Sequence, residues 1–351
     1  MPRKEILKIS FPLYSLFSGA VYDFSTIRNA EMFLSYPLNF NDPFDGAILI
    51  DKNEFVNEYL IKLYGDNFVS VATSILGKSS FTDIFTLIEM YNLIRKENLC
   101  CMPEYLKEGD IFFGINAETV KKECFALYDA YIAEIKEVRN EYGVACFTAN
   151  APETNMAMWA YYANNYKGFC CKFEFDYYNV DTNFDTKGTS DLLKHFYKIK
   201  YTKKIPYLEA RKLLSCPLNK VGKSKYIRNF VEKVLTLKNT QWKHENEYRL
   251  IIHKNSKLFP KTFHKNNKGF KIAFPYLQAL YIDLEKCVDE DSIVDIANVH
   301  SVKYYNLSPS KNGICLVEDK SKLNEHNLIL DVQKIPQTNL QHTAFEEDIP
   351  F

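Results

Sequence analysis

Residues 241–252 change abruptly from the polar sequence Gln-Trp-Lys-His-Glu-Asn-Glu to the apolar, strand-favouring run Tyr-Arg-Leu-Ile-Ile. Glu245 and Glu247 lie at this boundary, two residues apart. Residues i and i+2 of a strand project to the same face, so we expect the two carboxylates to point together into one cleft. The alternative is an edge strand with solvated carboxylates, in which Arg249 pairs across strands.

The two carboxylates lie in a strongly basic part of a chain whose formal net charge is zero. Residues 194–271 contain 21 Lys and Arg and four acidic residues, an excess of 17 positive charges (21 minus 4), which the rest of the chain balances. This separation predicts a basic surface that meets an anionic partner such as RNA or DNA. It also favours the ionised form of nearby carboxylates.

The overall composition is that of a globular protein with a substantial core. The chain has 351 residues, of which 46% are hydrophobic and 25% charged. No apolar run approaches the roughly 18 residues that span a bilayer, so we expect a cytoplasmic protein with no membrane partner. The nine cysteines include adjacent pairs at 100–101 and 170–171 but no CxxC spacing, which indicates free thiols rather than zinc ligands.

Apolar periodicity predicts strands near both ends of the chain and helices between them. We expect an α+β fold with a mainly antiparallel sheet, in a single domain over residues 1–333 with a loosely held tail at 334–351. A helical insertion is expected at about 53–142, and further helix at 207–238. The expected strands are 13–17, 32–35, 142–148, 169–175, 196–201, a segment ending at 253, 270–274, 279–282 and 302–307.

Two further segments have more than one interpretation. In residues 155–168, Trp159, Tyr162 and Tyr166 are spaced i, i+3 and i+7, so one helical face carries three rings. Such a face forms core or receives a planar ligand. The sequence Asn-Asp-Pro-Phe-Asp-Gly at 41–46 predicts a tight turn, and Asp42 and Asp45 would be the ligands if it were a metal loop.

Three boxes in this order resemble a bacterial family of unknown function that is often found near antiviral defence genes. They are Asn-Asp-Pro-Phe-Asp at 41–45, Met-Trp-x-x-Tyr-Ala at 158–163 with Gly168, and Trp-x-x-Glu-x-Glu-x-Arg at 242–249. Members tend to begin with Leu-Tyr-Lys-Tyr-Arg, whereas residues 13–17 here are Leu-Tyr-Ser-Leu-Phe. If the missing cation binds phosphate in the family, Arg28 or another basic residue must replace it.

The order of parts is also similar to the split-sheet fold of ADP-ribosyltransferases. This resemblance implies that NAD is a substrate, with Glu247 as the catalytic carboxylate and Glu245 orienting the acceptor. A fixed carboxylate bonded to the ribose 2′-hydroxyl would stabilise the oxocarbenium-like ribose left by nicotinamide. The two resemblances together suggest a toxin or effector in antiviral defence that modifies a nucleic acid or a protein.

The same resemblance implies a set of contacts to NAD. Trp159, Tyr161 or Tyr162 would stack on the nicotinamide, and a cation such as Arg249 would hold the pyrophosphate. Tyr14 or Thr148 would supply the early contact.

Two other functions fit the same residues. A Mg²⁺-dependent nuclease would use Asp42, Asp45, Glu245 and Glu247 with Lys243, although no Asp…Glu-x-Lys pattern is readable. A non-catalytic nucleic-acid-binding or sensor module would stack bases on the rings and track phosphates with lysines.

Overall fold

The computed structural model describes residues 12–64, 117–175, 191–260, 268–283, 285–311 and 313–319. The chain divides into two compact units. Unit 1 contains residues 1–39, 142–199 and 241–351, and unit 2 contains residues 40–141 and 200–240. The helical segment expected at 53–142 therefore lies in unit 2. Its middle part, like the tail from residue 334, is outside the described residues.

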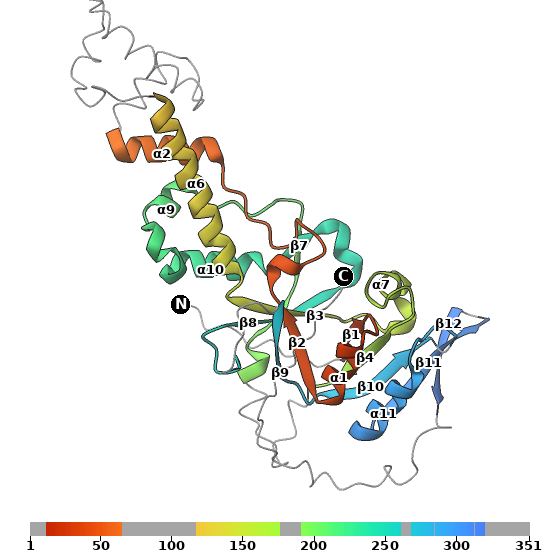
Figure 1. Cartoon of the computed structure of the whole chain (residues 1–351). Coiled ribbons are helices and arrows are strands. Elements are labelled where there is room, and N and C mark those ends of the chain that lie inside the picture. The colour runs from red at the N-terminus through yellow and green to blue at the C-terminus, as the bar shows by residue number, and fades with distance from the viewer. Residues whose placement is uncertain are drawn as a thin grey trace, which may run out of the picture. The chain divides into compact units, whose positions relative to one another are not determined.

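Unit 1 is a mixed α/β structure built on an open, mostly antiparallel sheet of ten strands (Figure 1). The order is β12-β11-β10-β4-β1-β3-β2-β9, with β8 added to β3 and β5 added to β8. The strands are β1 (Leu13–Phe17), β2 (Glu31–Ser35), β3 (Tyr142–Thr148), β4 (Phe169–Phe173), β5 (Phe196–Lys198), β8 (Glu247–His253), β9 (Gly269–Ala273), β10 (Leu277–Ile282), β11 (Lys303–Ser310) and β12 (Gly313–Asp319).

The sheet has two halves that meet at one registered pair, and the half that contains β3 includes a second such junction, where β2 joins β3 through Ser35 and Val144 alone. Strand β1 pairs with β4 along its whole length, and β3 pairs with β8 along its whole length. Between β1 and β3, however, the only registered pair in the described residues is Tyr14 with Thr148. The middle of the sheet is thus held by few ladder bonds, and these two side chains lie at that junction.

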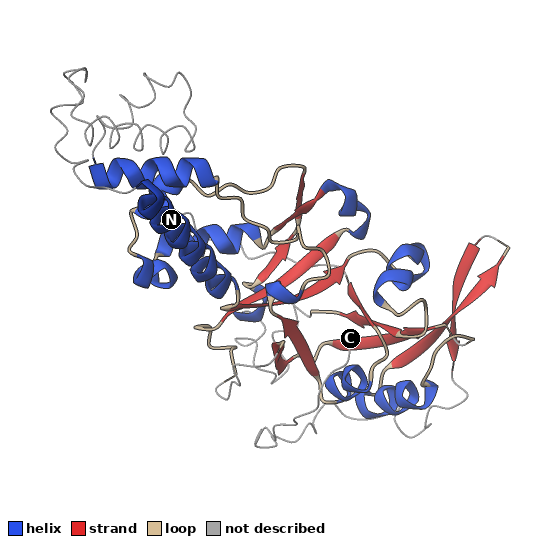
Figure 2. Ribbon diagram, turned by 45° about the horizontal axis from the view of Figure 1, so that its top comes forward, coloured by secondary structure: helices blue, strands red, loops and turns tan. Residues whose placement is uncertain are grey.

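Two helices cover one face of this sheet, as Figure 2 shows. They are α1 (Val21–Arg28) and α11 (Glu290–His300), which contact each other. Their apolar residues, among them Phe24, Ile27, Ile293 and Ile296, belong to one core cluster with the inward side chains of the strands. The side chain of Asp289 accepts a hydrogen bond from the Ser292 amide at 2.9 Å and so caps the start of α11.

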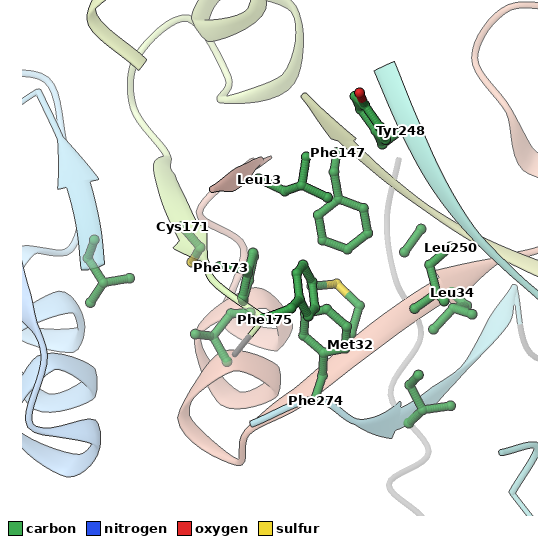
Figure 3. Packing of buried hydrophobic residues seen from close by; sticks show 14 of the residues in the cluster. Leu13, Met32, Leu34, Phe147, Cys171, Phe173, Phe175, Tyr248, Leu250 and Phe274 are labelled. Carbon is green, nitrogen blue, oxygen red and sulfur yellow. The ribbon is translucent and has the colours of Figure 1, made fainter. Parts of the chain in front are cut away.

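Aromatic side chains fill the centre of this core. The rings of Phe147 and Phe173 have their centroids 5.8 Å apart, and Phe274 lies 5.1 Å from Phe173 (Figure 3). They come from β3, from β4 and from the residue after β9, so strands distant in sequence share one hydrophobic contact. Burial of such large rings is a main source of stability for a sheet of this kind.

The opposite face carries η3 (Pro152–Thr154) and the short helix α7 (Met156–Tyr162). Trp159 is fully buried there, donates Nε1–H to the Pro152 carbonyl at 2.9 Å and stacks on Tyr166 at 5.9 Å. The helix ends at Tyr162, and Tyr166 lies in the following turn with φ 70°. The expectation of one helical face with three rings is therefore wrong for Tyr166, because the chain leaves the helix before that residue.

Unit 2 is mainly helical. Its helices pack around buried residues such as Phe55, Tyr131 and Val231, and the Phe55 ring meets Tyr131 edge to face at 5.6 Å. The elements are α2 (Lys52–Tyr64), α6 (Ala117–Arg139), α9 (Ala210–Leu214), η4 (Leu218–Lys223) and α10 (Lys225–Val234), with the parallel pair β6 (Lys200–Thr202) and β7 (Leu237–Asn239).

The turn expected at residues 41–46 is present in unit 2. The Phe44 amide bonds the Asp42 carboxylate at 2.9 Å, and Gly46 takes the left-handed conformation with φ 70°. Asp45 is buried and lies 3.9 Å from the buried Lys238 ammonium. The second aspartate of this box therefore helps to balance a buried positive charge inside the unit.

Most expected strands are present, but two C-terminal elements were not predicted. Helix α11 lies between the last two expected strands, and strand β12 follows the last one. The helix has a short apolar stripe, and β12 is only partly buried, with the sequence Gly-Ile-Cys-Leu-Val-Glu-Asp. Neither gave a periodic signal strong enough to separate it from loop.

Candidate functional site

The candidate site lies where η5 (Thr240–Glu245) joins β8. Glu245 ends the 3₁₀ helix, and Glu247 is the first residue of the strand. Between them Asn246 has φ 46°, a left-handed conformation that Asn adopts more readily than most residues. The prediction that both glutamates lie in one strand, on one face, is therefore wrong. The turn at Asn246 breaks the two-residue periodicity on which it depended.

Both carboxylates are nevertheless buried. Glu245 is 2% exposed and Glu247 is 3% exposed, so each needs a partner inside the protein. The Tyr162 hydroxyl donates to Glu245 Oε1 at 2.7 Å, which joins α7 to the end of η5. The edge strand with solvated carboxylates is excluded by this burial.

Glu247 forms an ion pair with Arg249, two residues further along the same strand. Arg249 Nε donates to Glu247 Oε1 at 2.6 Å, and the second guanidinium contact, to Oε2, is 3.3 Å. The Arg249 side chain is completely buried. A buried bidentate pair of this kind fixes the direction of the carboxylate.

Three of the predicted residues form a row across the sheet. Tyr14 on β1 is in register with Thr148 on β3, and Thr148 is in register with Glu247 on β8. Side chains in register on adjacent strands project to the same face. The single pair that joins the two halves of the sheet is thus part of the row that contains Glu247.

Thr148 also connects β3 to the end of η5. Its hydroxyl donates to the Glu245 carbonyl at 2.6 Å and accepts from the Asn150 amide at 3.0 Å. The Asn150 side chain donates to the His244 carbonyl at 2.7 Å, and Asn246 Nδ2 is 3.3 Å from Asn150 Oδ1. These contacts hold the backbone that carries the two glutamates. Asn150 and Asn246 were not predicted as site residues, although Asn between two glutamates is itself a turn signal.

The aromatic candidates differ in what they can offer a ligand. Trp159 is fully buried, so its ring has no surface left for a ligand in this structure. Tyr161 is 60% exposed, and its ring lies 6.1 Å from that of Trp242 and 6.4 Å from that of Tyr162. Tyr161 and Trp242 therefore form the accessible ring surface beside Glu245.

The sheet face next to Glu247 is open to solvent at one position. Cys146 lies on β3 in register with Arg249, two residues before Thr148, and it is exposed although its strand has neighbours on both sides. An exposed side chain in the middle of a sheet shows that no other part of unit 1 described here covers that point.

Burial raises the pKa of Tyr14 to about 12, and the negative charge of Glu153 adds to the effect. The Tyr14 hydroxyl therefore remains protonated at neutral pH and can donate a hydrogen bond. Its ring meets that of Tyr281 edge to face at 6.0 Å. Glu153, which was not predicted, belongs to this neighbourhood because η3 returns over the sheet after β3.

Other predicted features can be placed more briefly. Within the described part of the chain, no three His, Cys, Asp or Glu side chains come together in a way that could hold a metal ion. The seven cysteines described there are free, and Cys170 and Cys171 are both buried. No helix that the structure describes has the length and hydropathy needed to span a membrane.

The basic segment remains exposed where the structure describes it. Lys198, Lys243, Lys254 and Lys257 are exposed in unit 1. Exposed cations in unit 2 are Lys200, Lys203, Lys204, Arg211, Lys212, Lys220, Lys223, Lys225 and Lys233. In unit 2, Lys212 pairs with Glu209 and Arg211 with Glu58.

Comparison with known families identifies a similarity but no activity. Residues 158–250 match a family model described as "Protein of unknown function (DUF2971)". The match begins at Met158, the first residue of the Met-Trp-x-x-Tyr-Ala box, and extends through the Glu-x-Glu-x-Arg box, and it does not include the turn at 41–45. No curated protein matches the chain. No solved structure matches it either.

Proposed function

We propose that this protein is an NAD-dependent enzyme of the ADP-ribosyltransferase type. The observation that carries the proposal is the row of Tyr14, Thr148 and Glu247 across the junction of the two sheet halves, with Glu245 held beside it by Tyr162. A sheet joined at a single pair, with the late carboxylates at that junction, is what the resemblance to these transferases leads one to expect.

In this proposal Glu247 stabilises charge at the reacting carbon. The bond between ribose C1′ and the nicotinamide nitrogen breaks, and its electron pair goes to the nitrogen, which leaves as neutral nicotinamide. The ribose becomes oxocarbenium-like, and Glu247 accepts a hydrogen bond from its 2′-hydroxyl. An ionic group fixed in advance at a site of developing charge contributes about 3 kcal/mol or more to the rate.

Glu245 serves the second half of the reaction. The acceptor atom forms a bond to C1′ and loses a proton. In this proposal Glu245 is the base that accepts the proton. Tyr162 holds this carboxylate in place. Tyr161 and Trp242, which line the same edge, supply rings for the nicotinamide or for a base of the acceptor.

Arg249 has a different role in this proposal from the one that the resemblance implies. Because it is completely buried and paired with Glu247, it positions the catalytic carboxylate instead of binding the pyrophosphate. Exposed lysines such as Lys198 and Lys243 supply the positive charge for the phosphates. The acceptor is an RNA or DNA drawn to the basic segment, and the setting is antiviral defence, where the enzyme acts as a toxin.

The test is release of nicotinamide from labelled NAD in the presence of EDTA. The wild-type protein should release it, and Glu247→Gln should reduce release by at least about a hundredfold. Because Arg249 then loses its charged partner, the variant is also less stable. Glu247→Asp keeps the negative charge and serves as the second variant, with a similar loss of activity and a melting temperature closer to that of the wild type.

The matched control is Glu174→Gln, which removes an exposed carboxylate of the same unit that pairs with Lys172. It should release nicotinamide at the wild-type rate. If wild-type protein releases no nicotinamide but cleaves nucleic acid once Mg²⁺ is supplied, the nuclease is correct. Salt-dependent nucleic-acid binding without either activity would indicate the binding module.

A further inference from the structure

Glu153 presents a carboxylate oxygen that no hydrogen bond satisfies. The residue lies in the middle of η3, over the α7 face of the sheet in unit 1. Its Oε2 atom is buried, and no described residue donates to it. None of the described Lys and Arg side chains forms an ion pair with this carboxylate. Buried acceptors without partners are rare and cost stability, so such an atom at a surface-proximal turn requires an explanation.

A second unmatched polar group lies two residues further on. Asn155 is 9% exposed, and its Nδ2 atom is buried without an acceptor. Asn155 occupies the N-cap position of α7, where Asn usually accepts a hydrogen bond from the helix, yet its side chain makes no capping bond. The same short segment therefore holds one free acceptor and one free donor.

The Glu153 carboxylate is near enough to Tyr14 and Tyr281 for its charge to affect both phenols. Burial is the largest cause of the raised pKa of Tyr14, and the charge of Glu153 is the next largest. The same charge also raises the pKa of Tyr281, where burial and other neighbours have larger effects. Tyr281 in turn stacks on Tyr305 at 5.3 Å. Of the residues in this neighbourhood, Glu153 and Asn155 are the two in which a buried side-chain atom has no hydrogen-bond partner among the described residues.

We infer that Glu153 and Asn155 bind the carboxamide of nicotinamide. A carboxamide carries an NH₂ donor for Glu153 Oε2 and a carbonyl acceptor for Asn155 Nδ2, so one group satisfies both atoms. An ammonium group would satisfy Glu153 alone and leave Asn155 unmatched. The inference rests on the proposed function, because Tyr14 beside Glu153 is in the same row as Thr148 and Glu247.

The consequence is selectivity between NAD and its analogue in which a carboxylate replaces the carboxamide. The analogue would bring a negative charge against Glu153 and would lose the donor that Oε2 requires. Wild-type protein should therefore prefer NAD by about tenfold or more in kcat/KM for release of the free base. In Glu153→Gln the repulsion is absent, so the preference should fall to within about threefold.

Glu174→Gln is the matched control, since Glu174 also lies near Tyr14 but is exposed and paired with Lys172. It should keep the wild-type preference. An unchanged preference in Glu153→Gln, or an equal loss in both variants, would overturn the inference, because the effect would then be absent or a general effect of charge. Melting temperatures establish that each variant is folded.

Binding of the free bases separates this inference from the proposed function. Nicotinamide and nicotinate are titrated into the wild-type and Glu153→Gln proteins and followed by NMR. If NAD is not cleaved but nicotinamide binds in preference to nicotinate through Glu153, the proposed function fails and this site stands. If neither base binds the wild-type protein, the site assigned to Glu153 and Asn155 is wrong.

Discussion

At the residue scale, the site depends on buried carboxylates that bond to specific neighbours. Glu245 is held by Tyr162, and Glu247 by Arg249. Removing the donor at such a position lowers the stability of the folded protein considerably, because the buried carboxylate then has neither its hydration nor its partner. These residues are therefore tested best by variants that remove a single donor.

The first such variant is Tyr162→Phe, which removes the hydroxyl that donates to Glu245. It should lower the free energy of unfolding by about 1–3 kcal/mol, as expected for a buried charged acceptor that loses its donor. Urea denaturation measures the change. Tyr161→Phe is the control, because the neighbouring tyrosine is largely exposed and its variant should stay within about 0.5 kcal/mol of the wild type. Equal effects in both variants would contradict a specific role for Tyr162.

Tyr14 predicts a dependence of stability on alkaline pH. Burial first, and then Glu153, raise its pKa in the folded protein to about 12 from an ordinary value of 10. The unfolded chain thus loses this proton first as the pH rises. The contribution is fully present below about pH 10 and is lost as the pH approaches 12. Unfolding followed over this range should show a shallower decline in Tyr14→Phe than in the wild type; parallel curves would contradict the shift.

At the scale of elements, the site depends on how closely two segments approach each other. Gly168 ends the turn that leads from α7 into β4, and a Cβ atom there would lie 1.9 Å from the Phe17 carbonyl oxygen on β1. Only a residue without a side chain allows this contact. The glycine of the Met-Trp box therefore sets the position of α7, and with it that of Tyr162, over the sheet.

Gly168→Ala should accordingly destabilise unit 1 by more than about 2 kcal/mol, since backbone must move to remove the clash. Thermal unfolding measures the loss. Gly222→Ala is the matched control, because a Cβ at Gly222 would meet nothing nearer than 3.7 Å. That variant should remain close to the wild type. A Gly168→Ala protein with wild-type stability would show that α7 is not held by this approach.

At the scale of the whole molecule, the separation of charge along the chain is the dominant feature. A single basic segment carries an excess of 17 positive charges in a chain of zero net charge (21 cations minus four acids). Many of these cations are exposed in both units. An anionic polymer that neutralised them would release its counterions, and its affinity would depend steeply on salt.

Binding of single-stranded RNA tests this expectation. The logarithm of the binding constant should fall linearly with the logarithm of salt concentration. Replacing both Lys203 and Lys204 by Gln should reduce the slope by about 1.4, if each cation neutralises one phosphate. Lys311→Gln removes an exposed cation outside the segment and should leave the slope unchanged. If the variant that lacks Lys203 and Lys204 keeps the wild-type slope, this segment is excluded as the binding surface.

The local sequence alone predicted most elements of the sheet. Strands β1, β3, β4 and β8 were recognised because alternation and β-favouring side chains act over a few neighbouring residues. The turn at 41–46 was predicted for the same reason, since Asn, Asp, Pro and Gly impose their own backbone preferences. The clustered cations and the late pair of glutamates are likewise visible without a structure.

The partners of these groups depend on the tertiary structure. No sequence pattern indicates that Tyr162 reaches Glu245 or that Tyr14, Thr148 and Glu247 share a row, because strand order and register depend on contacts distant in the chain. The left-handed turn at Asn246 and the burial of Arg249 also depend on the packed environment. Local preference determines the elements, whereas burial and pairing between distant segments determine the chemistry that they can perform.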